Sequence, residues 1–269
     1  YIASGGWNHI KLTDENGEVY EKICKGNISI YTKSEKLKPV DIDLLNTKTI
    51  SPAYVKILAA SNFYRDVLKY DAFGDENRAL ALVINNSNNG DPQNAWSACG
   101  ESGIFALISI GSKRSPTIDV LGHEYTHAVA QSISRLNYKG ESGALAEAYG
   151  DIFGEIIEDW YNDSPKIVYR DIFRHWDTPV ESSLKWLDGD IAWSMGMNER
   201  NLATPQTNGL PVTYCGENWH DTENSKDDHG GVHANSTVIS HAAYLMTQPS
   251  VDETKYESLS TYDLAQLLA

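Results

Sequence analysis

The segment His123-Glu124-Tyr125-Thr126-His127 constrains this chain most strongly, because it lies in a stretch with helical hydrophobic spacing. On a helix, residues four apart lie on the same face, so the two imidazoles can occupy two corners of a tetrahedral zinc site. Glu124 then lies beside the metal rather than on it, where its carboxylate can take a proton from a metal-bound water. Two surface histidines on an amphipathic helix would give the same spacing, so the segment alone is suggestive only.

A zinc site of a hydrolase needs a third protein ligand and an open fourth position. Glu147 lies on the next predicted helix, with nineteen residues between it and His127. A connection of that length lets two antiparallel helices face each other across the metal. Asp151 lies one turn further along and can accept a hydrogen bond from the free ring nitrogen of a zinc-bound histidine. We therefore expect His123, His127 and Glu147 to bind zinc, with Asp151 behind them.

The hydrophobic pattern divides the chain into a β-rich front half and an α-rich back half. The first 50 residues alternate polar and apolar positions and contain turn sequences, which predicts hairpins or a meander. Strands are predicted over residues 79–84 and 105–110, and helices over about 52–70, 117–136, 142–161 and 232–246 and from near 260. Residues 162–231 lack strong periodicity, and so long a stretch in a compact domain usually has a function or binds ions.

We therefore predict an α+β fold of two lobes with the zinc site in the cleft between them. The β-rich lobe would cover residues 1–136 and end in the helix with the two histidines. The α-helical lobe would cover residues 137–269 and supply the third zinc ligand.

Charge and cysteine content restrict the partners and the compartment. The chain has 269 residues and a net charge of −15, which disfavours nucleic acids and anionic lipid surfaces as partners. No apolar run approaches the roughly 18 residues of a membrane helix, so we expect no membrane insertion. The chain begins at Tyr1 without a signal-peptide pattern, as a trimmed product of a precursor would. Cys24, Cys99 and Cys215 allow at most one disulfide, and whether Cys24 pairs with Cys99 or Cys215 stays open.

Three separated motifs occur in order along the chain: Gly122-His-Glu-Tyr-Thr-His-Ala-Val-Ala130, Glu141-Ser-Gly-Ala-Leu-Ala-Glu-Ala-Tyr-Gly-Asp-Ile-Phe-Gly154 and Gly230-Gly-Val-His-Ala-Asn-Ser236. Together they resemble the thermolysin family of secreted zinc metalloendopeptidases. The similarity runs from about residue 51 to residue 248 and is weakest over 162–227. The related zinc aminopeptidases have eighteen residues in place of the nineteen before Glu147 and contain a GAMEN-type motif, which is absent here.

The resemblance implies further roles in catalysis and substrate binding. His233 matches the family histidine that hydrogen-bonds the tetrahedral oxyanion, and Asp228 matches the carboxylate that orients this histidine. Tyr138 matches a tyrosine that also reaches the oxyanion. Asn94 and Ala95 match the edge segment that pairs with the substrate backbone. Tyr138 as a core residue and Asn94 as a turn residue are the alternatives.

The resemblance also implies calcium. Asp119, Glu155 and Glu158 match carboxylates that bind a structural calcium ion in the family, and Asp163 is a further candidate ligand. The acidic cluster that holds a second ion in some members is not reproduced at residues 164–170. We therefore expect one calcium ion at most.

The chain departs from the family at the arginine that grips the substrate carbonyl. The aligned position is Trp193, which cannot supply a bidentate donor. Either another base such as Arg200 substitutes for it, or the substrate binds differently.

We therefore predict a secreted zinc endopeptidase that acts on peptide or protein substrates as a monomer and is made as a precursor. One alternative is a zinc-containing binding module that has lost catalysis, for which Trp193 is the motive and against which the intact Glu124 and His233 argue. Another is an exopeptidase, which would need an anchor for a free chain terminus. A substrate with both ends blocked separates these alternatives from an endopeptidase.

Overall fold

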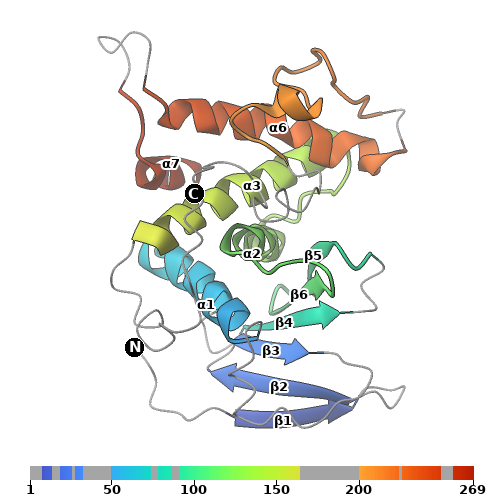
Figure 1. Cartoon of the computed structure of the whole chain (residues 1–269), viewed down its shortest axis with the longest axis vertical. Helices are drawn as coiled ribbons and strands as arrows, with labels where there is room; N and C mark the ends of the chain where they lie inside the picture. The colour runs from blue at the N-terminus through green and yellow to red at the C-terminus, as the bar shows by residue number, and fades with distance from the viewer. Residues whose placement is uncertain are drawn as a thin grey trace.

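The chain folds into a mixed β-sheet with layers of helices stacked on it (Figure 1). The computed structural model describes residues 8–13, 19–25, 28–32, 50–73, 78–86, 91–163, 200–223, 226–249 and 257–269. The predicted α+β class is confirmed by this mixture. The division into two lobes at residue 136 stays a prediction.

Six strands form the sheet in the order β1-β2-β3-β4-β6-β5. Their bounds are Asn8–Thr13 (β1), Val19–Lys25 (β2), Ile28–Thr32 (β3), Ala79–Asn86 (β4), Ala95–Cys99 (β5) and Phe105–Gly111 (β6). The strands β3, β4 and β6 are parallel neighbours, whereas β1, β2 and β5 pair antiparallel. At the centre, Leu82 pairs with Ile108 and both are fully buried, as the near-continuous apolar runs of these two strands require.

The predicted strands over 79–84 and 105–110 are confirmed as β4 and β6, and the hairpin region near the N-terminus contains β1, β2 and β3. The strand β5 was not predicted. Its sequence Ala-Trp-Ser-Ala-Cys is short and does not alternate cleanly. It becomes a strand because it pairs with β6 at the edge of the sheet.

The helices of the described residues agree with the predicted periodicity. Their bounds are Ile50–Asp66 (α1), Ile118–Ile133 (α2), Gly140–Asp163 (α3), Asp228–Thr247 (α6) and Thr261–Leu268 (α7). Figure 1 shows α2 between the sheet and α3, with α6 beyond α3. Residues 118–129 of α2 are all buried because neighbouring elements cover this helix on several sides.

An aromatic cluster joins α1 to the two central helices. The ring of Phe63 on α1 meets that of Phe153 on α3 with centroids 6.4 Å apart, and Tyr64 meets Tyr125 of α2 at 5.5 Å. The hydroxyl of Tyr64 donates a hydrogen bond to Thr126 Oγ1 at 2.9 Å. These contacts fix α2 and α3 relative to each other, which matters because both helices contribute site residues.

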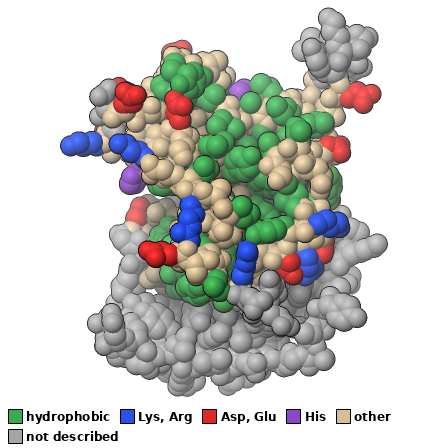
Figure 2. All heavy atoms as spheres, turned by 180° about the vertical axis from the view of Figure 1, so that it is seen from behind, with side chains coloured by type: hydrophobic (Ala, Val, Ile, Leu, Met, Phe, Trp, Pro, Cys, Tyr) green, Lys and Arg blue, Asp and Glu red, His purple; other side chains and the backbone are tan. Residues whose placement is uncertain are grey.

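On the back face, apolar side chains occupy the middle and charged side chains lie around them (Figure 2). Within the described ranges, no helix is both long enough and apolar enough to cross a lipid bilayer.

Candidate active site

Two imidazoles and one carboxylate meet where α2 lies against α3. His123 and His127 lie one turn apart on α2, and Glu147 reaches them from α3. His127 Nε2 is 3.1 Å from Glu147 Oε1, and His123 Nε2 is 3.6 Å from Glu147 Oε2. The candidate ligand atoms of the three residues all lie within 4.8 Å of one another, and the side chains are buried. The structure thus brings together the three residues expected to bind zinc.

Two glycines let the helices approach closely beside this cluster. A Cβ atom on Gly122 would lie 3.2 Å from Gly154 Cα, and a Cβ atom on Gly154 would lie 2.8 Å from the backbone oxygen of Asp119. Larger residues at this contact would separate α2 from α3. Glycine at both positions therefore sets the short spacing across which Glu147 can reach the histidines.

The donor set fits a zinc ion. Two imidazoles and one carboxylate are three ligands of the kind that catalytic zinc sites use. Oε2 of Glu147 and Oε2 of Glu124 are buried, and neither has a hydrogen-bond donor among the described residues. Burial raises the pKa of Glu147, but the imidazoles of His127 and His123 outweigh it and hold this pKa well below its usual value. The Glu147 carboxylate is therefore negative, as a ligand of a cation must be.

Asp151 lies behind the cluster, as expected. Its Oδ1 is 3.1 Å from His123 Nδ1, so the carboxylate can hold the ring with Nε2 directed at the metal position. Ser236 and Ser240 of α6 donate hydrogen bonds to Asp151 Oδ2 at 3.4 and 3.3 Å. These bonds tie α6 to the back of the metal cluster.

Arg200 also belongs to the site. The sequence indicates it only as a substitute for the arginine that Trp193 replaces. Its guanidinium donates hydrogen bonds to Asp151, the shortest of 2.6 Å from Nη2, and Nη2 also lies 3.6 Å from Glu147 Oε2. Burial raises the pKa of Asp151, but Arg200 and His123 outweigh it and lower this pKa. Trp193 lies outside the described residues. The local sequence around Arg200 has no periodicity that could have assigned it to the site.

The second group of expected residues contacts Glu147, one of the candidate zinc ligands. Tyr138 donates a hydrogen bond to Glu147 Oε1 at 2.6 Å, and its hydroxyl is 3.1 Å from His233 Nε2. On its other side, His233 Nδ1 hydrogen-bonds Asp228 Oδ1. Asp228 Oδ2 accepts the backbone N–H groups of His233 and Ala234 at 2.9 and 3.1 Å. Asp228 thus contacts both the ring and the backbone of His233, and its role in orienting this ring stays a prediction.

A left-handed run at the start of α6 makes this arrangement possible. The φ angles of Asp228, His229, Gly230 and Gly231 are 51°, 51°, 88° and 78°. A Cβ atom on Gly231 would lie 2.4 Å from His220 Cβ, so this position accepts glycine only. The turn brings the Asp228 carboxylate back onto the first backbone amides of the regular helix.

The three expected calcium ligands also come together. Carboxylate oxygens of Asp119, Glu155 and Glu158 all lie within 4.8 Å of one another, and Asp119 and Glu155 are buried. The side chain of Asp163 lies outside the described residues. The cluster is a candidate cation site on the same helix pair as the zinc ligands.

Asn94 and Ala95 lie where β5 begins, on the outer strand of the sheet. Asn94 is exposed, and β5 packs against α2, which carries the two histidines. The expected substrate-pairing segment is therefore at a sheet edge, beside the helix of the metal cluster. Pairing with a substrate itself stays a prediction.

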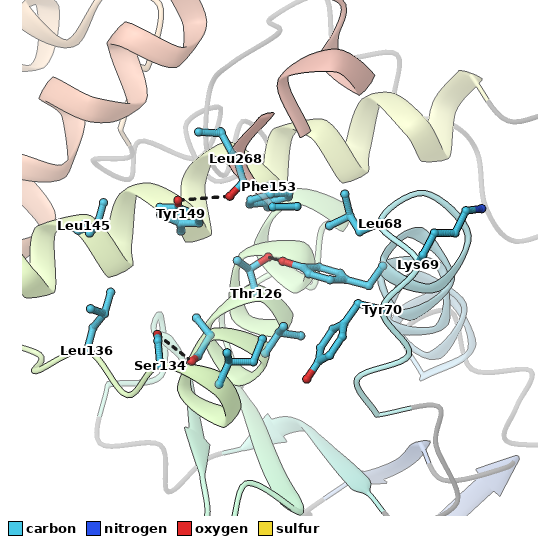
Figure 3. Close-up of a pocket in the computed structure, with 15 residues that line it drawn as sticks. Leu68, Lys69, Tyr70, Thr126, Ser134, Leu136, Leu145, Tyr149, Phe153 and Leu268 are labelled. Atoms are coloured by element: carbon cyan, nitrogen blue, oxygen red, sulfur yellow. Dashed lines mark hydrogen bonds between the residues drawn. The ribbon is translucent and has the colours of Figure 1, made fainter. Parts of the chain in front are cut away.

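A cavity of about 550 Å³ lies between the end of α1, the helices α2 and α3 and the end of α7 (Figure 3). Leu68, Val129, Leu145, Tyr149 and Leu268 are among its mainly apolar lining residues. None of the candidate zinc ligands lines it, so it is separate from the metal cluster.

Cys99 and Cys215 are free thiols. The sequence leaves open whether Cys24 pairs with Cys99 or with Cys215. Neither of these two cysteines forms a disulfide in the structure.

The fold and the cluster of two helical histidines, a glutamate from the next helix and a buried Glu124 are typical of metallopeptidases of the HExxH class. A family model described as the thermolysin metallopeptidase alpha-helical domain matches residues 134–267. The chain belongs to the thermolysin-like family of metallopeptidases.

Curated relatives agree with this assignment. The chain is 36% identical to a thermolysin of Alicyclobacillus acidocaldarius over 134 residues, which are 50% of this chain and 21% of the relative. It is 31% identical to a bacillolysin of Bacillus cereus over 189 residues, covering 69% of this chain and 29% of the relative. A gelatinase of Enterococcus faecalis is 27% identical over 243 residues, covering 88% and 42%. The chain thus spans between about a fifth and two fifths of these relatives.

Among solved structures, the precursor of protealysin, a metalloproteinase from Serratia proteamaculans, has a similar fold. The match has a TM-score of 0.52 at 20% identity and covers 89% of this chain and 71% of that chain.

Proposed function

We propose that this chain is a secreted zinc endopeptidase that hydrolyses internal peptide bonds, with Glu124 as the general base. The observation that carries the proposal is the meeting of His123, His127 and Glu147 beside a buried Glu124 carboxylate that has a free oxygen. When zinc is bound by these three residues, it polarises a carbonyl oxygen and lowers the pKa of a bound water to about 7.

The chain's own residues would supply the proton transfers and the stabilisation of charge. Glu124 accepts the proton of the attacking water and later passes it to the leaving amine. Negative charge develops on the carbonyl oxygen, and Tyr138 and His233 are the donors that meet it. Burial and the nearby Glu147 carboxylate raise the pKa of Tyr138, so the phenol keeps its proton and can donate it in a hydrogen bond. Asp228 holds the His233 ring in place.

Substrate binding is proposed at two positions. An extended peptide would pair with the edge strand β5 at Asn94 and Ala95, because an open sheet edge offers unpaired backbone groups to a further strand. Arg200 would meet a substrate carbonyl in place of the expected arginine, since its guanidinium lies at the metal cluster. The substrate cleft would lie between the β-rich first half and the α-helical second half.

Three further proposals accompany the activity. A single structural calcium ion would bind to Asp119, Glu155 and Glu158, whose hard oxygen ligands suit that ion. The protein would act as a monomer. It would be made as a precursor and secreted, which agrees with a structural neighbour that is itself a precursor.

Cleavage of internally quenched peptides with both ends blocked tests the activity. The zinc-loaded chain should cleave them, and Glu124→Gln should reduce kcat by at least about a hundredfold while it retains zinc, because only the proton acceptor is removed. Ser134→Ala, an exposed position near the end of the same helix, is the control and should behave like the wild type. Failure of the zinc-loaded wild type to cleave any blocked peptide would refute an endopeptidase.

A further inference from the structure

The edge strand β5 turns alternate residues toward and away from its neighbour β6. The backbone oxygen of Asn94 accepts the N–H of Gly111, and the N–H of Gly100 bonds Phe105 O, so positions 94 and 100 face inward. Because orientation alternates along a strand, positions 96 and 98 also face β6. Ala95, Ser97 and Cys99 therefore direct their backbone N–H and C=O groups outward, to the open edge of the sheet.

At the third of these outward residues, Cys99, the backbone N–H is already hydrogen-bonded to a side chain of α2. Gln131 Oε1 accepts the backbone N–H of Cys99 at 3.0 Å. Gln131 follows His123 and His127 at intervals of four residues, so it lies on the same face of α2, one turn beyond the metal pair. A side chain on the face of α2 that carries the two histidines thus forms a hydrogen bond with the edge strand.

We propose that Gln131 is a specificity-determining residue, whose side-chain amide ends the part of β5 that can pair with an extended peptide. This inference rests on the proposed function. Ala95 and Ser97 remain as outward positions, and they are two residues apart. In an antiparallel pair each outward residue exchanges two hydrogen bonds with one residue of the added strand. Pairing along β5 therefore spans about three residues of the substrate and stops before Cys99.

The partial burial of the strand supports this limit. Ser97 Oγ is buried and has no hydrogen-bond partner among the described residues. This hydroxyl can therefore still form a hydrogen bond. Cys99 has no corresponding free donor, because Gln131 satisfies its amide. A peptide that extended past Ser97 would not gain a hydrogen bond from the backbone N–H of Cys99.

A purely structural role would predict something different. If Gln131 served only to hold β5 against α2, its loss would weaken substrates of every length equally. If Gln131 ends the pairing edge, its loss frees the Cys99 N–H and favours only the substrates long enough to reach it. The length dependence of substrate binding therefore separates the two roles.

The experiment uses blocked peptides built on the sequence that the wild type cleaves fastest. Each series is extended by two alanines at a time, either at the amino end or at the carboxyl end. Dissociation constants are measured by calorimetry on the zinc-loaded full chain with Glu124→Gln, and kcat/KM on the cleaving chain. Gln131→Leu removes the hydrogen-bond acceptor at nearly constant length, whereas Gln131→Glu keeps an acceptor oxygen. Thermal melting of each variant reports its folding.

The proposal predicts that wild-type affinity stops rising at a fixed length at one end of the peptide. In Gln131→Leu the limit should move outward by two residues at that end alone, with a gain of about 3- to 10-fold for the longer peptides, the effect of one added hydrogen bond. Gln131→Glu should restore the wild-type limit. A limit unchanged in Gln131→Leu, or a uniform loss over all lengths, would overturn this proposal and leave the endopeptidase intact. Absence of both cleavage and binding would overturn the two together.

Discussion

At the scale of single residues, neighbouring groups set the charge of each member of the site. Glu147 and Tyr138 share one hydrogen bond, and their pKa values move apart: that of Glu147 falls beside two imidazoles, and that of Tyr138 rises through burial and the adjacent carboxylate. The glutamate is therefore a permanent anion and the tyrosine a permanent donor. Such a separation of roles between neighbouring titratable groups is typical of catalytic sites.

His233 provides a prediction about pH. Burial lowers the pKa of its ring, but the hydrogen bond to Asp228 outweighs burial, and the net effect raises this pKa. The protonated ring is the better oxyanion donor, so activity should be lost as the pH rises through the pKa of His233. Asp228→Asn removes the anion that raises this pKa, and the alkaline limb of the kcat/KM profile should move to lower pH.

The neighbouring Asp227→Asn is the control, because it removes the same charge without the hydrogen bond to His233. An alkaline limb that stays in place in Asp228→Asn, or that moves equally in both variants, would contradict this role of Asp228.

At the scale of the elements, the site depends on how closely α2 and α3 approach each other. The contact of Gly122 with Gly154 leaves no room for a side chain, and it lies immediately beside His123. The helices and the central strands could be predicted from hydrophobic periodicity, because apolar residues such as Val129 on α2 and Ile152 on α3 recur on the buried face of each helix. The edge strand β5 could not, because its pairing with β6 is not encoded in its own five residues.

Gly154→Val tests the close approach. The new side chain would meet the backbone of Asp119 and should destabilise the fold by about 2 kcal/mol, within the usual range for overpacking. For a chain of this size that corresponds to a fall in Tm of roughly 4–8 °C. Gly100→Val is the matched control, since its Cβ would lie 3.5 Å from Phe105 O in ordinary contact. Equal melting temperatures for the two variants would show that the helix contact is not tight.

At the scale of the whole molecule, two candidate metal clusters lie on one helix pair. The candidate zinc ligands lie where α2 meets the first half of α3, and Asp119, Glu155 and Glu158 meet further along the same two helices. Buried carboxylates repel each other unless a cation neutralises them. Cations bound at these clusters should therefore stabilise the folded chain as a whole.

Chelation tests this coupling between metal binding and stability. A ligand present at a hundred times its Kd stabilises the native state by about 2.7 kcal/mol, so removal of zinc by EDTA should lower Tm by roughly 5–10 °C. Zinc should restore most of the loss, and calcium added to the zinc-loaded chain should raise Tm further. Glu158→Gln should reduce the calcium response and leave the zinc response unchanged. A melting temperature indifferent to EDTA would show that neither cluster holds a cation.

The sequence predicted the centre of the site better than its periphery. His123, His127 and Glu147 could be predicted because helical spacing alone relates the histidines and a short connection reaches the third ligand. Tyr138 and His233 followed only from family resemblance, because 95 positions separate two residues that meet at 3.1 Å. The sequence indicates Arg200 only as a substitute for Trp193, since its contact with Asp151 is non-local and its surroundings have no regular pattern.

X-ray absorption at the zinc edge tests the central claim most directly, because it reports which atoms bind the metal. The account predicts two imidazole nitrogens at about 2.0–2.1 Å and carboxylate or water oxygens at about 2.0–2.2 Å, with one zinc ion per chain. Glu147→Ala should lose one oxygen ligand or lose the ion, whereas Glu124→Gln should leave the spectrum unchanged. A sulfur shell near 2.3 Å, or a spectrum without imidazole scattering, would contradict the assignment of His123, His127 and Glu147 as the zinc ligands.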